Sequence, residues 1–152
     1  MGWQPPPLLR DYRFMSLAYL ALGSNLGNRA ENLQTAISFL GSKSKVLNCS
    51  PVYETPPWGY EEQPKFLNQV VRVETDLTPS ELLDYVKEIE RKIGRKETFR
   101  YGPRSIDIDI LFYDDLVVNT PPLIIPHAQI TERAFVLVPL ADIAPDYIHP
   151  IL

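Results

Sequence analysis

Residues 105–113, with the sequence SIDIDILFY, alternate isoleucine with aspartate and form the clearest predicted strand in the chain. Side chains along a β-strand point to opposite faces in turn, so the isoleucines share one face and Asp107 and Asp109 share the other. The two aspartate Cα atoms are then roughly 6 to 7 Å apart. The stretch therefore predicts a strand with an apolar face on a core and two carboxylates on its open face.

The first part of the chain predicts two strands and a helix. Residues 16–23 predict a buried first strand, which ends in a glycine-containing turn. Asn28 begins an N-capping pattern, and the helix that follows is expected to extend to Gly41. Residues 45–57 predict a second strand that passes into a loop at 54–65, whose prolines are expected to keep it out of the sheet.

The remaining segments complete an alternation of strands and helices. Residues 66–76 predict a third strand. Thr78 begins a second predicted helix with a capping box, and Gly94 ends that helix. Residues 116–119 are expected to return beside the aspartate strand as a hairpin. Residues 131–144 fit a strand or a helix, and their apolar spacing favours a helix with an internal proline. The order βαββαββα predicts a ferredoxin-like α+β fold, a mainly antiparallel sheet with helices packed over one face.

Composition indicates one globular domain. The chain has 152 residues, 45% apolar and 22% charged, with no apolar run long enough for a membrane span and no secretory pattern, so a cytoplasmic location is expected. The proline-rich residues 1–15 predict a flexible arm or a non-native extension, with Met15 as a hypothesis for the natural start. Residues 16–152 predict the domain itself. Cys49 lies in a predicted strand and is expected to be a buried, inert thiol.

Charge is distributed unevenly along the chain. The formal net charge of -4 argues against a broad nucleic-acid surface. Residues 91–104 nevertheless carry a single acid, Glu97, among the cations Arg91, Lys92, Arg95, Lys96, Arg100 and Arg104. Such a segment suits a small polyanion such as a nucleoside triphosphate, although a solvated helix end with its loop would produce the same pattern.

The aspartate pair has two interpretations. It is either the polar face of an amphipathic strand or a site for Mg²⁺, which is usually bound through one or two carboxylates plus substrate phosphates. Neighbouring like charges repel and aspartate is a poor strand former, so surface solubility alone would favour other residues, and a divalent cation would remove this difficulty. The pair by itself leaves both interpretations open. Arg104, just upstream, either pairs with one of these carboxylates or completes a phosphate site beside the metal.

Several motifs, spread in order over about residues 17–145, resemble those of one enzyme family. They are LALGSNLGNRAENL at 20–33, VYETPPWG at 52–59, GPRSIDIDILFYDD at 102–115, PH at 126–127 and ERAFVLVPLADIAP at 132–145. Together they resemble the 6-hydroxymethyl-7,8-dihydropterin pyrophosphokinases of folate biosynthesis. The resemblance implies a ferredoxin-like α+β fold and transfer of the pyrophosphoryl group of ATP, the co-substrate, to the hydroxymethyl oxygen of the pterin. That reaction releases AMP and uses two Mg²⁺ ions.

The resemblance also implies roles for individual residues. Asp107 and Asp109 would ligate both Mg²⁺ ions, and Arg95 and Arg104 would act beside them in catalysis. The pterin-side residues would be Thr55, Pro56, Trp58, Phe66, Asn68 and Phe135, with the two phenylalanines on either face of the flat ring. The nucleotide-side residues would be Glu90, Lys96, Tyr101, Arg104, His127 and Arg133. No obligate protein partner is implied.

Other interpretations of these residues stay open. Without the resemblance, Phe66 and Phe135 fit a core, Glu90 fits an exposed helix charge and His127 fits a structural histidine. At the level of the whole chain, a ferredoxin-like module that binds a nucleotide or RNA without catalysis is the alternative from another class. A structural domain, in which the aspartates are only a polar strand face, is a further one.

Three positions depart from the family pattern. Glu97 stands where many members carry a basic residue, Tyr101 where many carry a tryptophan, and Ala128 where an aromatic residue is frequent. Lys96 is expected to replace the missing cation, while Ala128 removes one adenosine contact. The loop at 97–101 is expected to close over the substrates.

Overall fold

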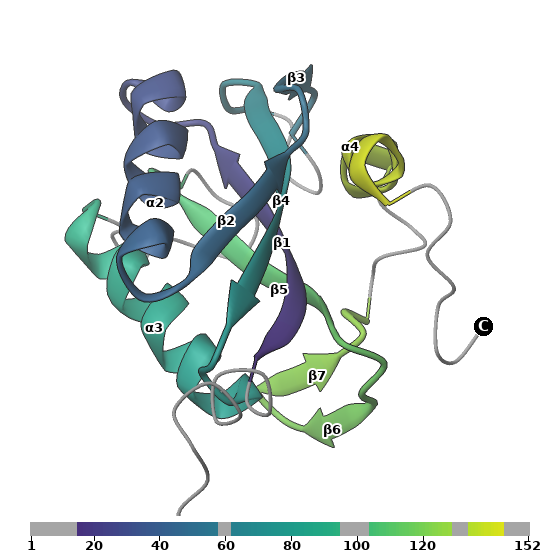
Figure 1. Cartoon of the computed structure of the whole chain (residues 1–152). Coiled ribbons are helices and arrows are strands. Elements are labelled where there is room, and N and C mark those ends of the chain that lie inside the picture. Colours follow the sequence, from purple (N-terminus) through teal and green to yellow (C-terminus); the bar gives the residue numbers. More distant parts are fainter. Residues whose placement is uncertain (1–14, 58–61, 95–103, 129–133, 145–152) are drawn as a thin grey trace, which may run out of the picture.

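The computed structural model describes residues 15–57, 62–94, 104–128 and 134–144 (Figure 1). A five-stranded antiparallel sheet has the order β2-β4-β1-β5, with β3 also paired to β4, and β6 and β7 form a second, two-stranded sheet. The strands are β1 Ser16–Ser24, β2 Lys45–Cys49, β3 Tyr53–Thr55, β4 Phe66–Thr75, β5 Asp107–Tyr113, β6 Val118–Thr120 and β7 Leu123–Ile125. The helices are α2 Arg29–Lys43, α3 Pro79–Lys92 and α4 Ala134–Ile143. The predicted ferredoxin-like α+β class is confirmed.

The helices lie on both faces of the main sheet. Helices α2 and α3 cover one face, and their buried residues join those of β1, β4 and β5 in the larger apolar core (Figure 1). Helix α4 lies on the opposite face, where Val136 and Leu140 pack with Tyr19, Val70, Leu111 and Phe112. The expectation that the helices cover one face is therefore right for α2 and α3 and wrong for α4.

A bulge in β5 gives α4 its apolar support. Tyr19 pairs with Phe112 and the next residue of β1, Leu20, pairs with Ile110, so Leu111 is the extra residue. Leu111 and Phe112 consequently face the same side, although they are adjacent in sequence. Strict alternation would have divided them between the two faces.

The second helix is capped as the sequence predicts. Thr78 and Glu81 form a capping box, and the hydrogen bonds from the backbone and the hydroxyl of Thr78 lower the pKa of the Glu81 carboxyl. Gly94 follows the helix with φ +95°, which suits glycine. The expected boundaries of this helix are confirmed.

Helix α2 corrects one expected boundary. The side chain of Asn28 accepts a hydrogen bond from the Glu31 N–H, so the predicted N-cap is present. The helix does not stop at Gly41 but continues to Lys43, with Ser44 as its C-cap. Glycine ends a helix efficiently when it takes a positive φ, and Gly41 has none.

The strands depart from expectation at two places. The second predicted strand divides into β2 and β3, because Ser50 pairs through its own hydroxyl: Val70 N–H donates to Ser50 Oγ (2.9 Å) while Ser50 N–H donates to Val70 O (2.8 Å). Glu54 and Thr55, expected in a loop, pair with β4. Residues 116–119 do not pair with β5; β6 pairs instead with β7 across two prolines, which lack the N–H that a longer ladder needs.

Four remaining expectations concern Cys49, residues 131–144, membrane spans and the N-terminal arm. Cys49 is exposed at the end of β2, so its expected burial is wrong, although partial burial still raises the pKa of its thiol. The choice of a helix for residues 131–144 is confirmed by α4, which contains Pro139. Among the described residues, no helix is long and apolar enough to cross a membrane. The arm at 1–15 lies outside the described residues apart from Met15.

Candidate active site

One row of residues crosses the main sheet on the face away from α2 and α3. Asp107 of β5 pairs with Gly23 of β1, Gly23 pairs with Asn68 of β4, and Asn68 pairs with Tyr53 of β3. Directly paired residues of antiparallel strands share a face, so these four side-chain positions point the same way. The second aspartate, Asp109, pairs with Ala21 in the next row on this face. Asp107 and Asn68 therefore lie in one row with Gly23 between them, and Asp109 lies in the next row on the same face.

Gly23 leaves the room that its neighbours occupy. A Cβ atom at this position would lie 3.2 Å from Asn68 Oδ1 and 3.4 Å from Phe66 Cδ1. Asn68 is only 6% exposed, and its amide donates a hydrogen bond to Thr55 Oγ1. Three of the predicted pterin-side residues, Thr55, Phe66 and Asn68, are therefore brought together next to the row.

His127 lies beside the second aspartate. Its Nε2 is 3.8 Å from Asp109 Oδ1, and both side chains are partly exposed. The backbone N–H of His127 donates to Leu111 O (3.1 Å), which joins the loop after β7 to the bulge of β5. His127, predicted on the nucleotide side, and Asp109, predicted as a metal ligand, are therefore neighbours.

The two aspartates fit a magnesium site in which the protein supplies only a few of the ligands. Both are half-buried on the sheet face rather than enclosed in the core. Among the described residues, no group of three or more His, Cys, Asp or Glu side chains is placed to hold a metal. A pair of carboxylates is nevertheless the donor set that Mg²⁺ uses when substrate phosphates complete its coordination.

Glu90 is buried and not the exposed helix charge that one interpretation expected. It is 1% exposed, its Oε2 accepts from Ile108 N–H (3.0 Å), and Lys87 Nζ lies 3.3 Å from its Oε1. Ile108 separates the two aspartates in sequence, and β5 is an edge strand of the main sheet. Glu90 therefore ties α3 to the backbone that carries both carboxylates. Whether it also contacts a nucleotide stays a prediction.

Asn25 joins the entry of β5 to the loop before β4, and the sequence prediction missed it. It is 1% exposed; its Oδ1 accepts from Arg104 N–H (2.7 Å), and its amide donates to Gln63 Oε1 (2.8 Å) and Pro64 O (3.0 Å). A buried polar side chain with these partners strongly constrains the backbones that it connects. Its position in the GSNLGN turn was the only local signal.

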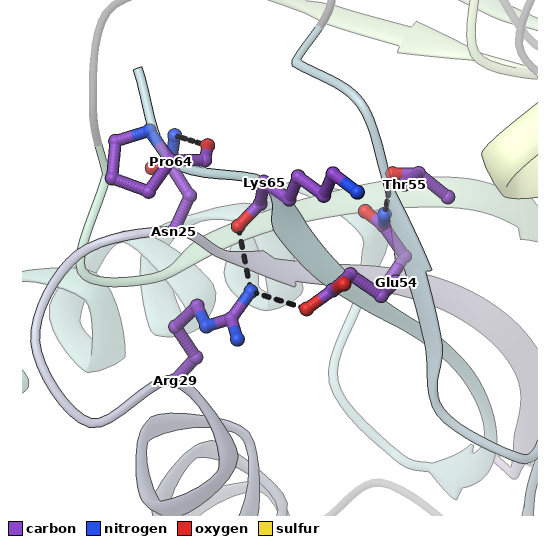
Figure 2. Close-up of polar contacts among 7 residues, drawn as sticks. Asn25, Arg29, Glu54, Thr55, Pro64 and Lys65 are labelled. Carbon is purple, nitrogen blue, oxygen red and sulfur yellow. Dashed lines mark hydrogen bonds and ion pairs between the residues drawn. The ribbon is translucent and has the colours of Figure 1, made fainter.

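Arg29, also missed, makes contacts on both sides of the same loop. Figure 2 shows its Nη1 donating to Lys65 O (2.9 Å) and lying 3.0 Å from Glu54 Oε2. Glu54 immediately precedes Thr55 and Lys65 immediately precedes Phe66. Arg29 is the first residue of α2, so this helix reaches both ends of the excursion between β3 and β4.

Tyr53 connects the far end of the row to α4. Its hydroxyl donates to Asp142 Oδ2 (2.5 Å). This hydrogen bond, then burial and the charge of Asp142, raise the pKa of the Tyr53 hydroxyl. The bond links β3 to the helix that contains Phe135.

The remaining predicted residues are only partly placed. Pro56 is exposed just after β3, and Ala128 is exposed next to His127. Phe135 lies in α4, but its side chain is outside the described part of the chain. Six further positions lie wholly outside it, namely Trp58, Arg95, Lys96, Glu97, Tyr101 and Arg133.

The fold and the sheet-face site define a ferredoxin-like α+β protein, and comparison with known proteins is more specific. Residues 19–145 match the family model of 7,8-dihydro-6-hydroxymethylpterin-pyrophosphokinase. A 2-amino-4-hydroxy-6-hydroxymethyldihydropteridine pyrophosphokinase of Aquifex aeolicus is 46% identical over 137 residues, which cover 90% of this chain and 86% of the relative. The chain belongs to the 7,8-dihydro-6-hydroxymethylpterin-pyrophosphokinase family.

Longer proteins also contain a similar segment. A folic acid synthesis protein of Dictyostelium discoideum is 47% identical over 137 residues, but the chain spans only 21% of its length. The crystal structure of wild-type Plasmodium falciparum HPPK-DHPS superposes with a TM-score of 0.74 at 22% identity, covering 91% of this chain and 43% of that one. The predicted enzyme class, a pyrophosphokinase of folate biosynthesis, is confirmed by the family match, and the non-catalytic module is not favoured.

Proposed function

We propose that the chain transfers the pyrophosphoryl group of ATP to the hydroxymethyl oxygen of 6-hydroxymethyl-7,8-dihydropterin and releases AMP. Family membership supports the reaction. The observation that supports this location of the site is the row from Asp107 through Gly23 to Asn68, with Asp109 in the next row on the same face. The proposed metal-binding pair is thus on the same sheet face as Thr55, Phe66 and Asn68. The proposal assigns this activity to residues 16–152 as one domain, in the cytoplasm and without an obligate protein partner.

The pterin end of the proposed site is the cluster next to Gly23. Phe66 stacks on the flat ring, and Phe135 of α4 takes the opposite face. Asn68 both donates and accepts, so its amide suits the ring edge once its orientation is held by Thr55. Pro56 and Trp58 complete this end in the proposal.

The phosphate end is the aspartate pair. Asp107 and Asp109 would hold two Mg²⁺ ions through their carboxylates, and Arg95 and Arg104 would bind phosphate oxygens of ATP. Mg²⁺ bound there would neutralise charge on the phosphate oxygens of ATP. His127 lies close enough to Asp109 to contact the same phosphates.

The reaction then depends mainly on alignment. The pterin hydroxymethyl oxygen forms a bond to the β-phosphorus, and the bond from that phosphorus to the oxygen it shares with the α-phosphate breaks, so that AMP leaves with this oxygen. The hydroxyl proton passes to solvent water. The carboxylates and arginines keep the entering and leaving oxygens in line, with the row across the sheet as the scaffold. We assign no general base.

The nucleotide end is assigned to Glu90, Lys96, Tyr101, Arg104, His127 and Arg133. Glu97 places a negative charge in the basic segment, and Ala128 offers no ring to adenine. Both differences from the family pattern affect the affinity for ATP rather than the reaction itself.

The test is AMP release with ATP and Mg²⁺, in the presence and absence of the hydroxymethyl pterin. AMP should form only with the pterin, and Asp109→Ala should lower turnover by at least about a thousandfold while its near-native circular dichroism is retained. Asp84→Ala, an exposed aspartate on α3, is the matched control and should be as active as the unmodified chain. Near-normal AMP release by Asp109→Ala would refute the assigned metal site.

Calorimetry separates the remaining alternative. A nucleotide- or RNA-binding module should bind an ATP analogue equally well with and without Mg²⁺ and pterin. The proposed enzyme should require Mg²⁺ for the analogue, because the aspartates contact the nucleotide through the metal.

A further inference from the structure

Arg29 holds the two ends of the excursion that connects β3 to β4. A single nitrogen, Nη1, donates to the backbone carbonyl of Lys65 (2.9 Å) and forms an ion pair with Glu54 (3.0 Å), as Figure 2 shows. Hydrogen bonds in which one partner is ionised are stronger than neutral ones. The residue thus makes one contact to the backbone after the excursion and one to a side chain before it.

These contacts come from the side of the sheet opposite the row of site residues. Glu54 pairs with Leu67, and Leu67 packs against the core that α2 and α3 cover. Thr55, Phe66 and Asn68 instead cluster beside Gly23 on the other face. Arg29 therefore lies behind the proposed pterin pocket and has no direct route to a ligand in it.

Asn25, in the segment between β1 and α2, is a second anchor for the excursion. Asn25 binds Gln63 and Pro64, and Arg29 binds Lys65, so three consecutive residues before Phe66 are held from the β1–α2 segment. Asn25 is buried and also supports Arg104, whereas the Arg29 and Glu54 side chains are 31% and 47% exposed. Arg29 is thus the anchor that can be changed with little damage to the core.

We propose that Arg29, with Glu54, is a positioning residue for pterin binding, an inference that rests on the proposed function. It acts by fixing the Lys65 carbonyl and hence the backbone from which Phe66 projects. An exposed ion pair adds little to overall stability, so its effect should appear in substrate affinity rather than in folding. Arg29 is not among the residues assigned to the nucleotide end, so the effect should be confined to the pterin.

The experiment measures AMP-release kinetics with each substrate varied in turn. Arg29→Ala should raise KM for the pterin about fivefold, with kcat and KM for ATP within about twofold of the unmodified chain. Glu54→Gln removes the ion pair and leaves the contact to the Lys65 carbonyl, so it should raise the pterin KM only about twofold. Arg29→Lys retains a cationic donor and should recover most of the lost affinity.

The matched control is Glu88→Ala, which removes the Lys92–Glu88 ion pair of α3 (3.1 Å; 50% and 41% exposed). It should leave all three kinetic parameters unchanged. Equal increases in both KM values for Arg29→Ala, or a pterin KM like that of the unmodified chain, would overturn the inference. If Arg29→Ala does not fold, the Glu54→Gln and Arg29→Lys results decide.

Failure of the proposed function is recognised separately in the same assay. It would appear as pterin-independent or absent AMP release by the unmodified chain, and it would remove this inference as well. If the unmodified chain is active, the pterin KM values of the Arg29 and Glu54 variants test the positioning role alone.

Discussion

On the face of the main sheet toward α2 and α3, β1 and β5 bury Leu22 and Ile108, whereas on the other face the same strands carry Gly23 and Asp107. The two pairs are in neighbouring rows of the sheet. The first pair contributes apolar burial, and the second contributes space and charge. A strand directs adjacent residues to opposite faces, so one residue of each adjacent pair contributes to the core and the other to the proposed site.

The largest expected difference between the faces is in stability. Leu22→Ala, on the covered face, should lower the free energy of unfolding by about 3 kcal/mol, because it leaves a cavity at a fully buried position. The kcat of the folded fraction should change little. Urea unfolding combined with an AMP-release assay would check this. A Leu22→Ala protein that unfolds like the unmodified chain would contradict the idea that the covered face supplies stability.

A smaller but more specific effect is expected at Gly23. Gly23→Ala brings a methyl group within 3.2 Å of Asn68 Oδ1 and 3.4 Å of Phe66, so both should shift and the pterin KM should rise about tenfold. Gly41→Ala is the control, since nothing lies within 4 Å of its added Cβ and alanine favours the helix. Equal kinetics for the two variants would show that the space beside Asn68 is not used.

The smallest expected effect is a pH dependence on the α4 side. The Tyr53 pKa is raised from 10.0, mainly by the hydrogen bond to Asp142. The protonated hydroxyl is therefore favoured in the folded protein, so its contribution is complete below pH 10 and is lost as pH rises through the folded-state pKa. Tyr53→Phe should be slightly less stable at neutral pH and should lose less stability on the alkaline side. Parallel thermal-melting curves for both proteins above pH 10 would contradict the role of this bond.

Local signals predicted the elements that depend on few residues. Thr78, Glu81 and Gly94 define α3 through a cap, a returning carboxylate and a positive φ, all within the helix and its ends. The isoleucine and aspartate alternation likewise predicted β5. Where a residue acts differently from its type, prediction failed, as with Gly41 inside α2 and the Ser50 hydroxyl that interrupts the strand.

Strand alternation predicted the shared face of Asp107 and Asp109, whereas the other candidate site residues came only from the resemblance, and their roles stay predictions. The resemblance listed Thr55, Phe66, Asn68, Asp107 and Asp109; the structure brings Phe66, Asn68 and Asp107 next to Gly23, with Thr55 bonded to Asn68 and Asp109 one row away on the same face. It did not include Asn25 or Arg29, because their partners lie between 25 and 79 residues away in the sequence, at no spacing that a sequence pattern records.

The sequence alone determined the strand with its two carboxylates, the capped helix and the family, since each is encoded in short stretches of residues. Only the tertiary structure decided that α4 covers the other face, that Gly23 joins Asp107 to Asn68, and that Arg29 supports the loop from behind. These features depend on strand register, on one bulge at Leu111 and on side-chain contacts between distant segments. Periodicity specifies which face a residue occupies, but packing specifies what it meets there.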